Sequence, residues 1–207
     1  MEKLGMRGVM IRPNPYRNRN WDDPVYDPFW AEVQSLGVPV SVHEGTTGDM
    51  PTAGADRCKN FFFMHIISHP HEQQIACMQI VCGGVLEKFP QLKVAFLESG
   101  GGWLPHWLER FDSHYDKLGF MVPYLKMKPS EYFQRQCYIS FDPDEKTLAA
   151  TVELVGEDSI VWASDYPHFD ALCPGVVEEL REQAEHLSRS ARRKVMGENA
   201  VRLYNLG

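Results

Sequence analysis

The stretch that decides the fold is LKVAFLESGGGWLPHWLERF, residues 92–111. Residues 92–97 are apolar apart from Lys93, which is typical of a buried strand. Glu98 and three glycines follow. From Trp103 to Phe111, apolar side chains recur every three or four positions, as in an amphipathic helix. The stretch therefore predicts one βα unit with a carboxylate at the end of its strand.

The same organisation extends in both directions along the chain. Further strands are predicted at 8–12, 38–42, 138–141 and 160–163, and helices at 28–36, 60–68, 72–89, 145–155, 176–186, 190–196 and 198–204. Short apolar strands separated by helices predict a parallel α/β sheet covered by helices. With 207 residues and no linker, a single domain over residues 1–207 is expected. Five βα units leave two alternatives, an incomplete (β/α)8 barrel, whose full form has about 250 residues, and an open doubly wound sheet.

Composition narrows the class of partner. Lys plus Arg is 21 and Asp plus Glu is 28, so the net charge is −7, and no basic tract is present. This balance argues against nucleic acid as a partner. No run of 18 apolar residues could span a membrane. The five cysteines form no CxxC pair, which favours a reducing, cytoplasmic compartment. A small-molecule substrate is the expected partner.

Polar residues follow the predicted strands at their carboxyl ends, where parallel α/β folds bind ligands. These residues are His43-Glu44, Glu98, Asp142, and Asp165 with His168 close behind. His43 is either a metal ligand or a histidine that hydrogen-bonds the strand end. Asp165 is a metal ligand, a general base, both, or a helix cap. Glu98 is a base, an acid, a ligand, or a structural clamp held by the glycine turn.

A second group of candidates is the sequence His69-Pro-His71-Glu72, expected at the start of a helix. Glu72 suits the positive end of the helix dipole. His69 and His71 are either ligands or residues of a substrate pocket. The remaining histidines are expected to have no role in the site: His65, His106, His114 and His186.

Four segments together resemble the amidohydrolase-2 family, which includes aminocarboxymuconate-semialdehyde decarboxylase and resorcylate decarboxylase. They are residues 69–112, YFQRQCYISFDPDE (132–145), SIVWASDYPHFD (159–170) and ENAVRLYNL (198–206). The resemblance implies a (β/α)8 barrel with a divalent metal, usually zinc, with manganese as the alternative. It implies that His43 matches the metal ligand after the fifth strand and Asp165 the one after the eighth.

The sequence departs from the family in two ways. The first-strand motif D/E/H-x-H has no counterpart here, so the chain is expected to correspond to the last five βα units, N-terminally truncated. The family's decarboxylases place a histidine base after the sixth strand, where this chain has Glu98. A glutamate could replace it if burial raised its pKa.

The expected function is a metal-dependent hydrolase of a small carbonyl- or carboxylate-bearing substrate, in which Asp165 takes the proton of a metal-polarised water. The alternatives are a non-oxidative decarboxylase of an aromatic or muconate-like acid, a catalytically inactive barrel remnant, and, last, a nucleotide-binding open sheet. The predicted site residues are as follows: catalytic, Asp165 and Glu98; metal-binding, His43 and Asp165; substrate-binding, Glu44, His69, His71 and His168.

Two further expectations concern the loops and the sheet edge. The loops at Thr46–Arg57 and Gly119–Glu131 would select the substrate. The predicted strand at 8–12 would be an unprotected apolar edge of an incomplete barrel. Such an edge predicts a homo-oligomer.

Overall fold

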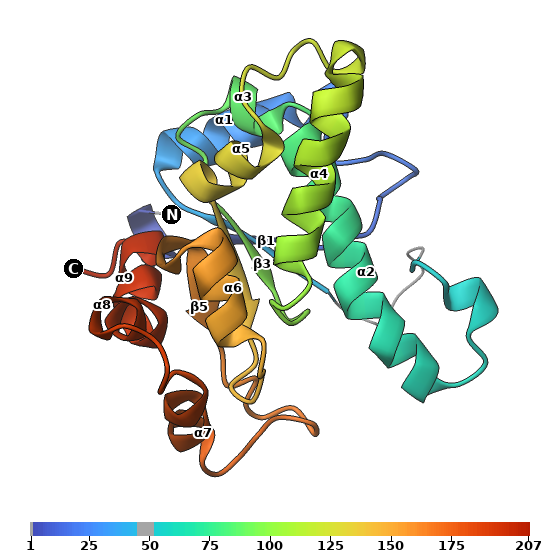
Figure 1. Cartoon of the computed structure of the whole chain (residues 1–207). Coiled ribbons are helices and arrows are strands. Elements are labelled where there is room, and N and C mark those ends of the chain that lie inside the picture. The colour runs from blue at the N-terminus through green and yellow to red at the C-terminus, as the bar shows by residue number, and fades with distance from the viewer. Residues whose placement is uncertain (1, 45–51) are drawn as a thin grey trace.

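The structure is a computed structural model that describes residues 2–44 and 52–207. Residues 46–51 of the expected substrate-selecting loop Thr46–Arg57 therefore lie outside the described residues. Five parallel strands form one sheet in sequential order: β1 (Val9–Ile11), β2 (Val40–His43), β3 (Val94–Leu97), β4 (Cys137–Phe141) and β5 (Ile160–Trp162). All five predicted strands are confirmed, and each neighbouring pair is joined by a crossover that contains helix (Figure 1).

The helices are α1 (Asp27–Leu36), α2 (Phe61–Cys82), α3 (Val85–Lys88), α4 (Leu104–Leu118), α5 (Pro129–Gln136), α6 (Leu148–Val155), α7 (Val176–Gln183), α8 (Arg189–Arg193) and α9 (Asn199–Tyr204). A π-helical turn, Lys194–Glu198, joins α8 to α9. Short 3-10 turns lie at Glu2–Leu4, Pro24–Tyr26, Ala55–Arg57, Gly119–Met121 and Glu157–Ser159. No helix in the described ranges has both the length and the apolarity needed to cross a bilayer.

Apolar side chains alternate between the two faces of the sheet and form a separate hydrophobic cluster on each face. In β3, Val94 and Phe96 face the larger cluster, which packs the sheet against α1, α2 and α4 to α7. Ala95 faces the smaller cluster, which Leu203 of α9 covers on the other side of the sheet. Successive side chains of a strand point to opposite faces, so the central strand β3 is covered by protein on both sides, whereas Met10 of the edge strand β1 is 68% exposed.

Buried amides fix the strands to the helices. The side chain of Gln73, on α2, is fully buried and donates to the carbonyls of Val42 (2.8 Å) and Leu97 (3.0 Å). This pair of bonds ties the ends of β2 and β3 together, where the polar strand-end residues begin. Asn199 makes an equivalent pair with the carbonyls of Glu157 and Ile160 at the start of β5.

Two helix predictions were wrong. The segment 60–68 and most of the segment 72–89 form one helix, α2, that continues through Pro70 and ends at Cys82, and Val85–Lys88 form the separate helix α3. Glu72 therefore lies in the middle of a helix and not at its positive end. The second error is an omission. The helix α5 was not predicted, because the sequence KPSEYFQRQ shows little apolar periodicity.

Candidate active site at the carboxyl ends of the strands

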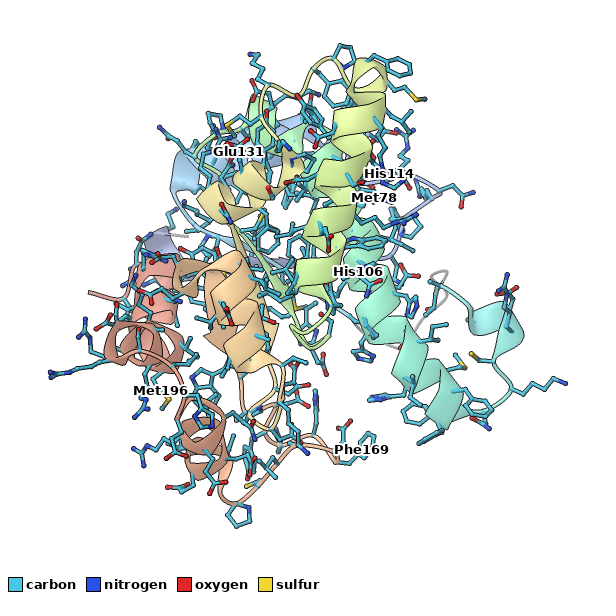
Figure 2. All side chains as sticks on the ribbon, in the orientation of Figure 1. Met78, His106, His114, Glu131, Phe169 and Met196 are labelled. Atoms are coloured by element: carbon cyan, nitrogen blue, oxygen red, sulfur yellow. The ribbon has the colours of Figure 1, made fainter. Side chains whose placement is uncertain are left out.

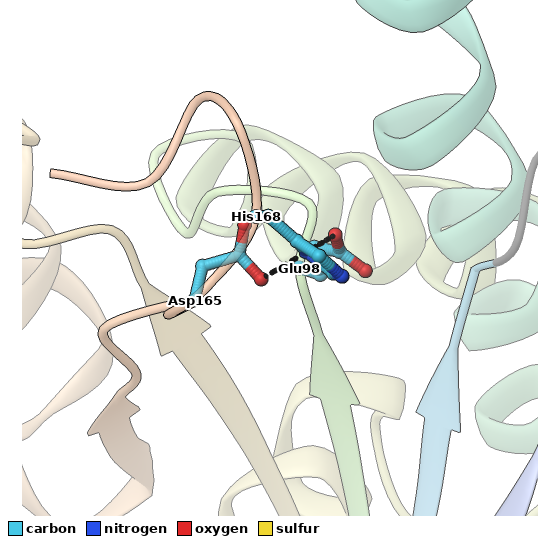
Figure 3. A group of neighbouring side chains, drawn as sticks. All are labelled: Glu98, Asp165 and His168. Atoms are coloured by element: carbon cyan, nitrogen blue, oxygen red, sulfur yellow. Dashed lines mark ion pairs between the residues drawn. The ribbon is translucent and has the colours of Figure 1, made fainter.

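The polar residues after β2, β3 and β5 converge at one edge of the sheet. His43 Nε2 lies 2.9 Å from Glu98 Oε2. His168 Nδ1 lies 2.7 Å from Asp165 Oδ1 and 3.6 Å from Glu98 Oε1 (Figure 3). His69, on α2, approaches Glu98 from the side, at 3.9 Å. Glu98 is thus the centre of a cluster of three imidazoles.

The backbone is strained at both carboxylates. Glu98 has φ 54° and Asp165 has φ 55°, left-handed values that few residues other than glycine adopt. Each of the two residues comes shortly after the end of its strand. Such conformations persist where surrounding structure holds them, and they concentrate at functional sites. The strain turns both side chains toward the edge where they meet.

A cavity of about 500 Å³ opens beside this cluster. Glu98 and Asp165 lie in its wall together with residues from α2, from the loop after β4 and from the loop after β5. These others are His65, His69, Pro70, Ser99, Gly100, Asp142, Pro143, Asp144, Ser164, Asp170, Ala171 and Leu172. The volume suits a small organic molecule.

The charges within the cluster follow from its contacts. The hydrogen bond to Glu98 raises the pKa of His43 above its ordinary value, although burial opposes this. Burial disfavours the charged form of Glu98, but the hydrogen bond from His43 and the nearby imidazoles outweigh it and lower the pKa of Glu98. Burial lowers the pKa of His69. The condition under which Glu98 could replace the family's histidine, a pKa raised by burial, is not met, because three imidazoles lie close to this glutamate and favour its anion.

The donor atoms in the cluster fit a divalent metal. One ligand atom from each of Glu98, Asp165 and His168 lies within 4.8 Å of the others. Imidazole nitrogen and carboxylate oxygen are ligands of both zinc and manganese. His43 is not one of these three residues, and it contacts the group through Glu98, 2.9 Å from its Nε2.

Two predicted site residues lie elsewhere. The side chain of Glu44 is buried against Arg12, with 3.6 Å between Oε1 and a guanidinium nitrogen, and is not in the cavity wall. His71 is exposed, and its Nδ1 contacts the carbonyl oxygen of Ile67. The structure does not bring either residue to the cluster.

The sequence prediction missed two residues of the cavity. His65 was expected to have no role, yet it packs on the ring of His69 (4.8 Å between centroids) and lies 3.5 Å from Asp170. Helical spacing of four between His65 and His69 could have indicated a shared face. Asp142 was named only as the residue that follows the fourth predicted strand, with no role assigned to it. Its proximity to the carboxyl groups of Glu145 and Asp144 becomes clear only once the path of the loop is known.

Asp142, in the cavity wall, has a raised pKa, whereas the pKa of Glu98 is lowered. Loss of hydration, followed by the charges of Glu145 and Asp144, raises the pKa of Asp142 from 3.8 to about 6. Asp142 therefore keeps its proton up to about pH 6. It can serve as a proton donor where Glu98 is an anion.

This shift predicts a pH-dependent stability effect for Asp142→Asn. The folded pKa lies above the unfolded one, so the neutral carboxyl is favoured by folding, and this contribution is lost as pH rises through about 6. Asparagine cannot ionise. In metal-free protein the variant should be more stable than wild type at pH 8 by about 1 kcal/mol, since the carboxyl is open to the cavity and partly screened. Thermal melts at pH 4 and pH 8 test this, and the difference should vanish at pH 4.

His106 and His114 lie exposed on α4 (Figure 2), and neither is in the wall of the cavity beside the cluster. A second cavity of about 490 Å³ lies between α2 and α4, with Met78 and His114 in its wall. Its other wall residues are mostly apolar, and no carboxylate is among them. It therefore offers mainly apolar contact and lacks the carboxylates found at the strand ends.

Comparison with known proteins places this geometry in a family. The sequence pattern of the amidohydrolase family Amidohydro_2 matches residues 1–206. The chain belongs to the amidohydrolase family. The resemblance stated from the sequence is thus confirmed, and so is the fold class, a parallel α/β sheet of the amidohydrolase barrel type with five βα units.

Individual relatives are decarboxylases. The chain is 29% identical to a 2-amino-3-carboxymuconate-6-semialdehyde decarboxylase of Dictyostelium discoideum, over 99% of this chain and 55% of that protein. It superposes with a TM-score of 0.80 on 5-carboxyvanillate decarboxylase from Sphingomonas paucimobilis, at 25% identity, covering 98% of this chain and 59% of that one.

A third relative was solved with a metal. Dihydroxybenzoic acid decarboxylase from a Polaromonas species, with bound manganese and the inhibitor 2-nitroresorcinol, superposes with a TM-score of 0.78 at 23% identity. The match covers 99% of this amidohydrolase chain and 62% of that one. The chain thus spans little more than half the length of the relatives it matches.

Proposed function

We propose that this amidohydrolase chain belongs to a metal-dependent, non-oxidative decarboxylase of a small aromatic or muconate-like carboxylic acid. The observation that carries the proposal is the convergence of His43, Glu98, Asp165 and His168 beside a cavity of about 500 Å³. The names of the similar proteins support decarboxylation over hydrolysis. This reverses the order of preference that the sequence suggested.

We place the metal at the carboxyl ends of β2, β3 and β5, held by His43 and Asp165 with Glu98 and His168 in reach. A bound divalent ion would supply positive charge to hold the substrate's carboxylate and a neighbouring oxygen. Zinc was expected from the resemblance, and manganese is the ion named with one similar structure. Both are candidates for this chain.

The chain's own residues would handle the proton. In decarboxylation the bond to the carboxylate carbon breaks, its electron pair stays on the ring or chain carbon, and a proton takes the place of CO2. Glu98 touches His43 and lies near His69 and His168, so a proton can pass between carboxylate and imidazole there. Asp142, with its raised pKa, is the second candidate donor. His69 and His168, in or beside the cavity, would contact the substrate.

Hydrolysis remains a second candidate because of one contact. His168 Nδ1 lies 2.7 Å from Asp165 Oδ1, so a proton that Asp165 took from water could pass to His168. A direct test supplies the chain with manganese or zinc and assays CO2 release from 2,6-dihydroxybenzoate and from the aminocarboxymuconate semialdehyde. Ester hydrolysis is assayed in parallel. Hydrolysis without CO2 release would favour the second candidate. The absence of both activities would favour a catalytically inactive remnant.

Metal binding gives a separate prediction. After treatment with a chelator, the chain should bind close to one equivalent of Mn2+ or Zn2+ in isothermal titration calorimetry. His43→Ala and Asp165→Asn should each weaken binding by about tenfold or more, because each removes a ligand. His71→Ala is the matched control, since His71 is exposed and outside the cluster. Equal affinity in all four proteins would place the metal elsewhere.

We also propose that a second copy covers the open edges of the sheet. β1 and β5 each pair on one side only in the described sheet, and Met10 in the middle of β1 is 68% exposed. Unpaired strand edges with apolar side chains favour association. Sedimentation at micromolar concentration should therefore show a dimer or a larger assembly. A stable monomer with a cooperative thermal transition would contradict this.

The compartment is inferred from the cysteines. All five are unpaired thiols: Cys58, Cys77, Cys82, Cys137 and Cys173. Burial raises the pKa of Cys137 well above its ordinary value and that of Cys82 to about 12, so neither is a reactive thiolate. Unpaired thiols support the proposal of a reducing, cytoplasmic location.

A further inference from the structure

Glu145 lies in the loop between β4 and α6, and its carboxylate accepts hydrogen bonds from a different loop. Gly101 N donates to both oxygens at 3.0 Å, and Gly102 N donates to Oε2 at 3.2 Å. Within its own loop, Asp142 N donates to Oε1 at 2.9 Å and Thr147 Oγ1 donates to Oε2 at 3.4 Å. One side chain thus joins the loop after β4 to the glycine turn after β3.

The turn that Glu145 holds comes directly after Glu98. Gly100 has φ 65°, and a Cβ there would stand 3.3 Å from the Glu145 oxygens. Glu98 itself is in the left-handed conformation, at φ 54°. Backbone strain of this kind persists only where the surroundings fix it. The contact with His43 holds the carboxylate of Glu98. A different contact must therefore hold the backbone that follows Glu98.

We propose that Glu145 is a positioning residue: its carboxylate pins the Gly100–Gly102 turn and so keeps Glu98 aimed at His43. The role of Glu98 in proton transfer rests on the function proposed above, whereas the placement of Glu98 can be measured without substrate or metal. Hydrogen bonds from amides to a charged acceptor are stronger than those to a neutral one. Burial raises the pKa of Glu145, and the hydrogen bonds from Asp142, Gly101 and Gly102 oppose that rise, so the carboxylate that accepts these bonds is what joins the two loops.

A purely local role makes a different prediction. If Glu145 only stabilised the two loops that it joins, losing it would loosen Gly101 and Gly102 and lower the melting temperature. His43 would be unaffected. If Glu145 positions Glu98, the contact between Glu98 and His43 must change as well. The His43 ring therefore distinguishes the two roles.

The experiment uses the metal-free, isotope-labelled full chain at one fixed pH. Glu145→Gln keeps the size of the side chain but replaces one acceptor oxygen with a donor, and Glu145→Ala removes both acceptors. Glu153→Gln, exposed on α6, is the matched control for loss of charge. NMR measures amide exchange at Gly101 and Gly102 and the ring signals of His43. Glu98→Gln supplies the signals of a His43 without its carboxylate partner.

We expect Gly101 and Gly102 to exchange about tenfold faster or more in Glu145→Gln, with a larger effect in Glu145→Ala. The His43 signals should move toward those of Glu98→Gln, and the double variant Glu98→Gln/Glu145→Gln should show no further change at His43. Glu153→Gln should match wild type in both readouts. Unchanged glycine exchange would overturn the proposal, and so would faster exchange with His43 at its wild-type position. Neither outcome depends on decarboxylation or metal binding.

Discussion

Replacing Glu98 with glutamine is expected to reduce decarboxylation by roughly 10²- to 10⁴-fold, the usual contribution of a positioned proton-transfer group. Glutamine has the same size but cannot carry the proton, and it replaces the anion that pairs with His43. Folding should be nearly unchanged, because Glu98 is only half-buried at the cavity wall.

The measurement compares CO2 release and thermal melting for wild type, Glu98→Gln and the control Glu153→Gln. Glu153 is exposed on α6, so its variant should keep full activity. Full activity in Glu98→Gln would reduce Glu98 to a structural clamp. Loss of activity together with a large fall in melting temperature would show that the glutamate is needed for folding instead.

Replacing Gly101 with alanine should destabilise the fold by about 3 kcal/mol, at the upper end of what overpacking costs. A Cβ at Gly101 would overlap the ring of Phe141, which is fully buried at the end of β4 and has no space to move. Either the ring or the turn must shift, and a shift of the turn also weakens its hydrogen bonds to Glu145.

Gly119→Ala is the matched control for this change. Gly119 has right-handed helical φ and ψ, and its Cβ would meet Tyr115 at 3.5 Å, an ordinary contact. Its stability should therefore match that of wild type or slightly exceed it. Urea unfolding of the two variants gives the comparison. Equal stability of Gly101→Ala and wild type would mean that the turn and the Phe141 ring adapt freely.

The strands could be predicted because each is a short apolar run that ends at a polar residue, and tertiary structure did not override that signal. The helix α2 could not be predicted as a unit. Pro70 removes one backbone donor and usually ends a helix. Here the residues after it are buried against the sheet, with Gln73 fixed to two strand ends, and this packing outweighs the local preference.

The meeting of Glu98 with Asp165 was predictable for a geometric reason. Parallel strands end at the same edge of their sheet, so residues that follow different strands come together. Asp142 follows β4 and reaches the same edge for the same reason, but its raised pKa could not be predicted. That pKa depends first on burial and then on the nearby charge of Glu145, and Glu145 acts across two loops whose path the local sequence does not specify. The choice between hydrolysis and decarboxylation is likewise not encoded in these residue types.

The two ends of the described chain lie beside each other (Figure 1). A Cβ on Gly8 would touch the Tyr204 ring at 3.4 Å, and Asn205 Nδ2 donates to the carbonyl of Gly37 at 3.1 Å. A short peptide could therefore join the segment after Tyr204 to the segment before Gly8, with new ends opened at the exposed turn near Phe120. Such a circular permutant would still place each strand beside its present neighbours. The order in which the βα units leave the ribosome would then be free to change without altering the sheet.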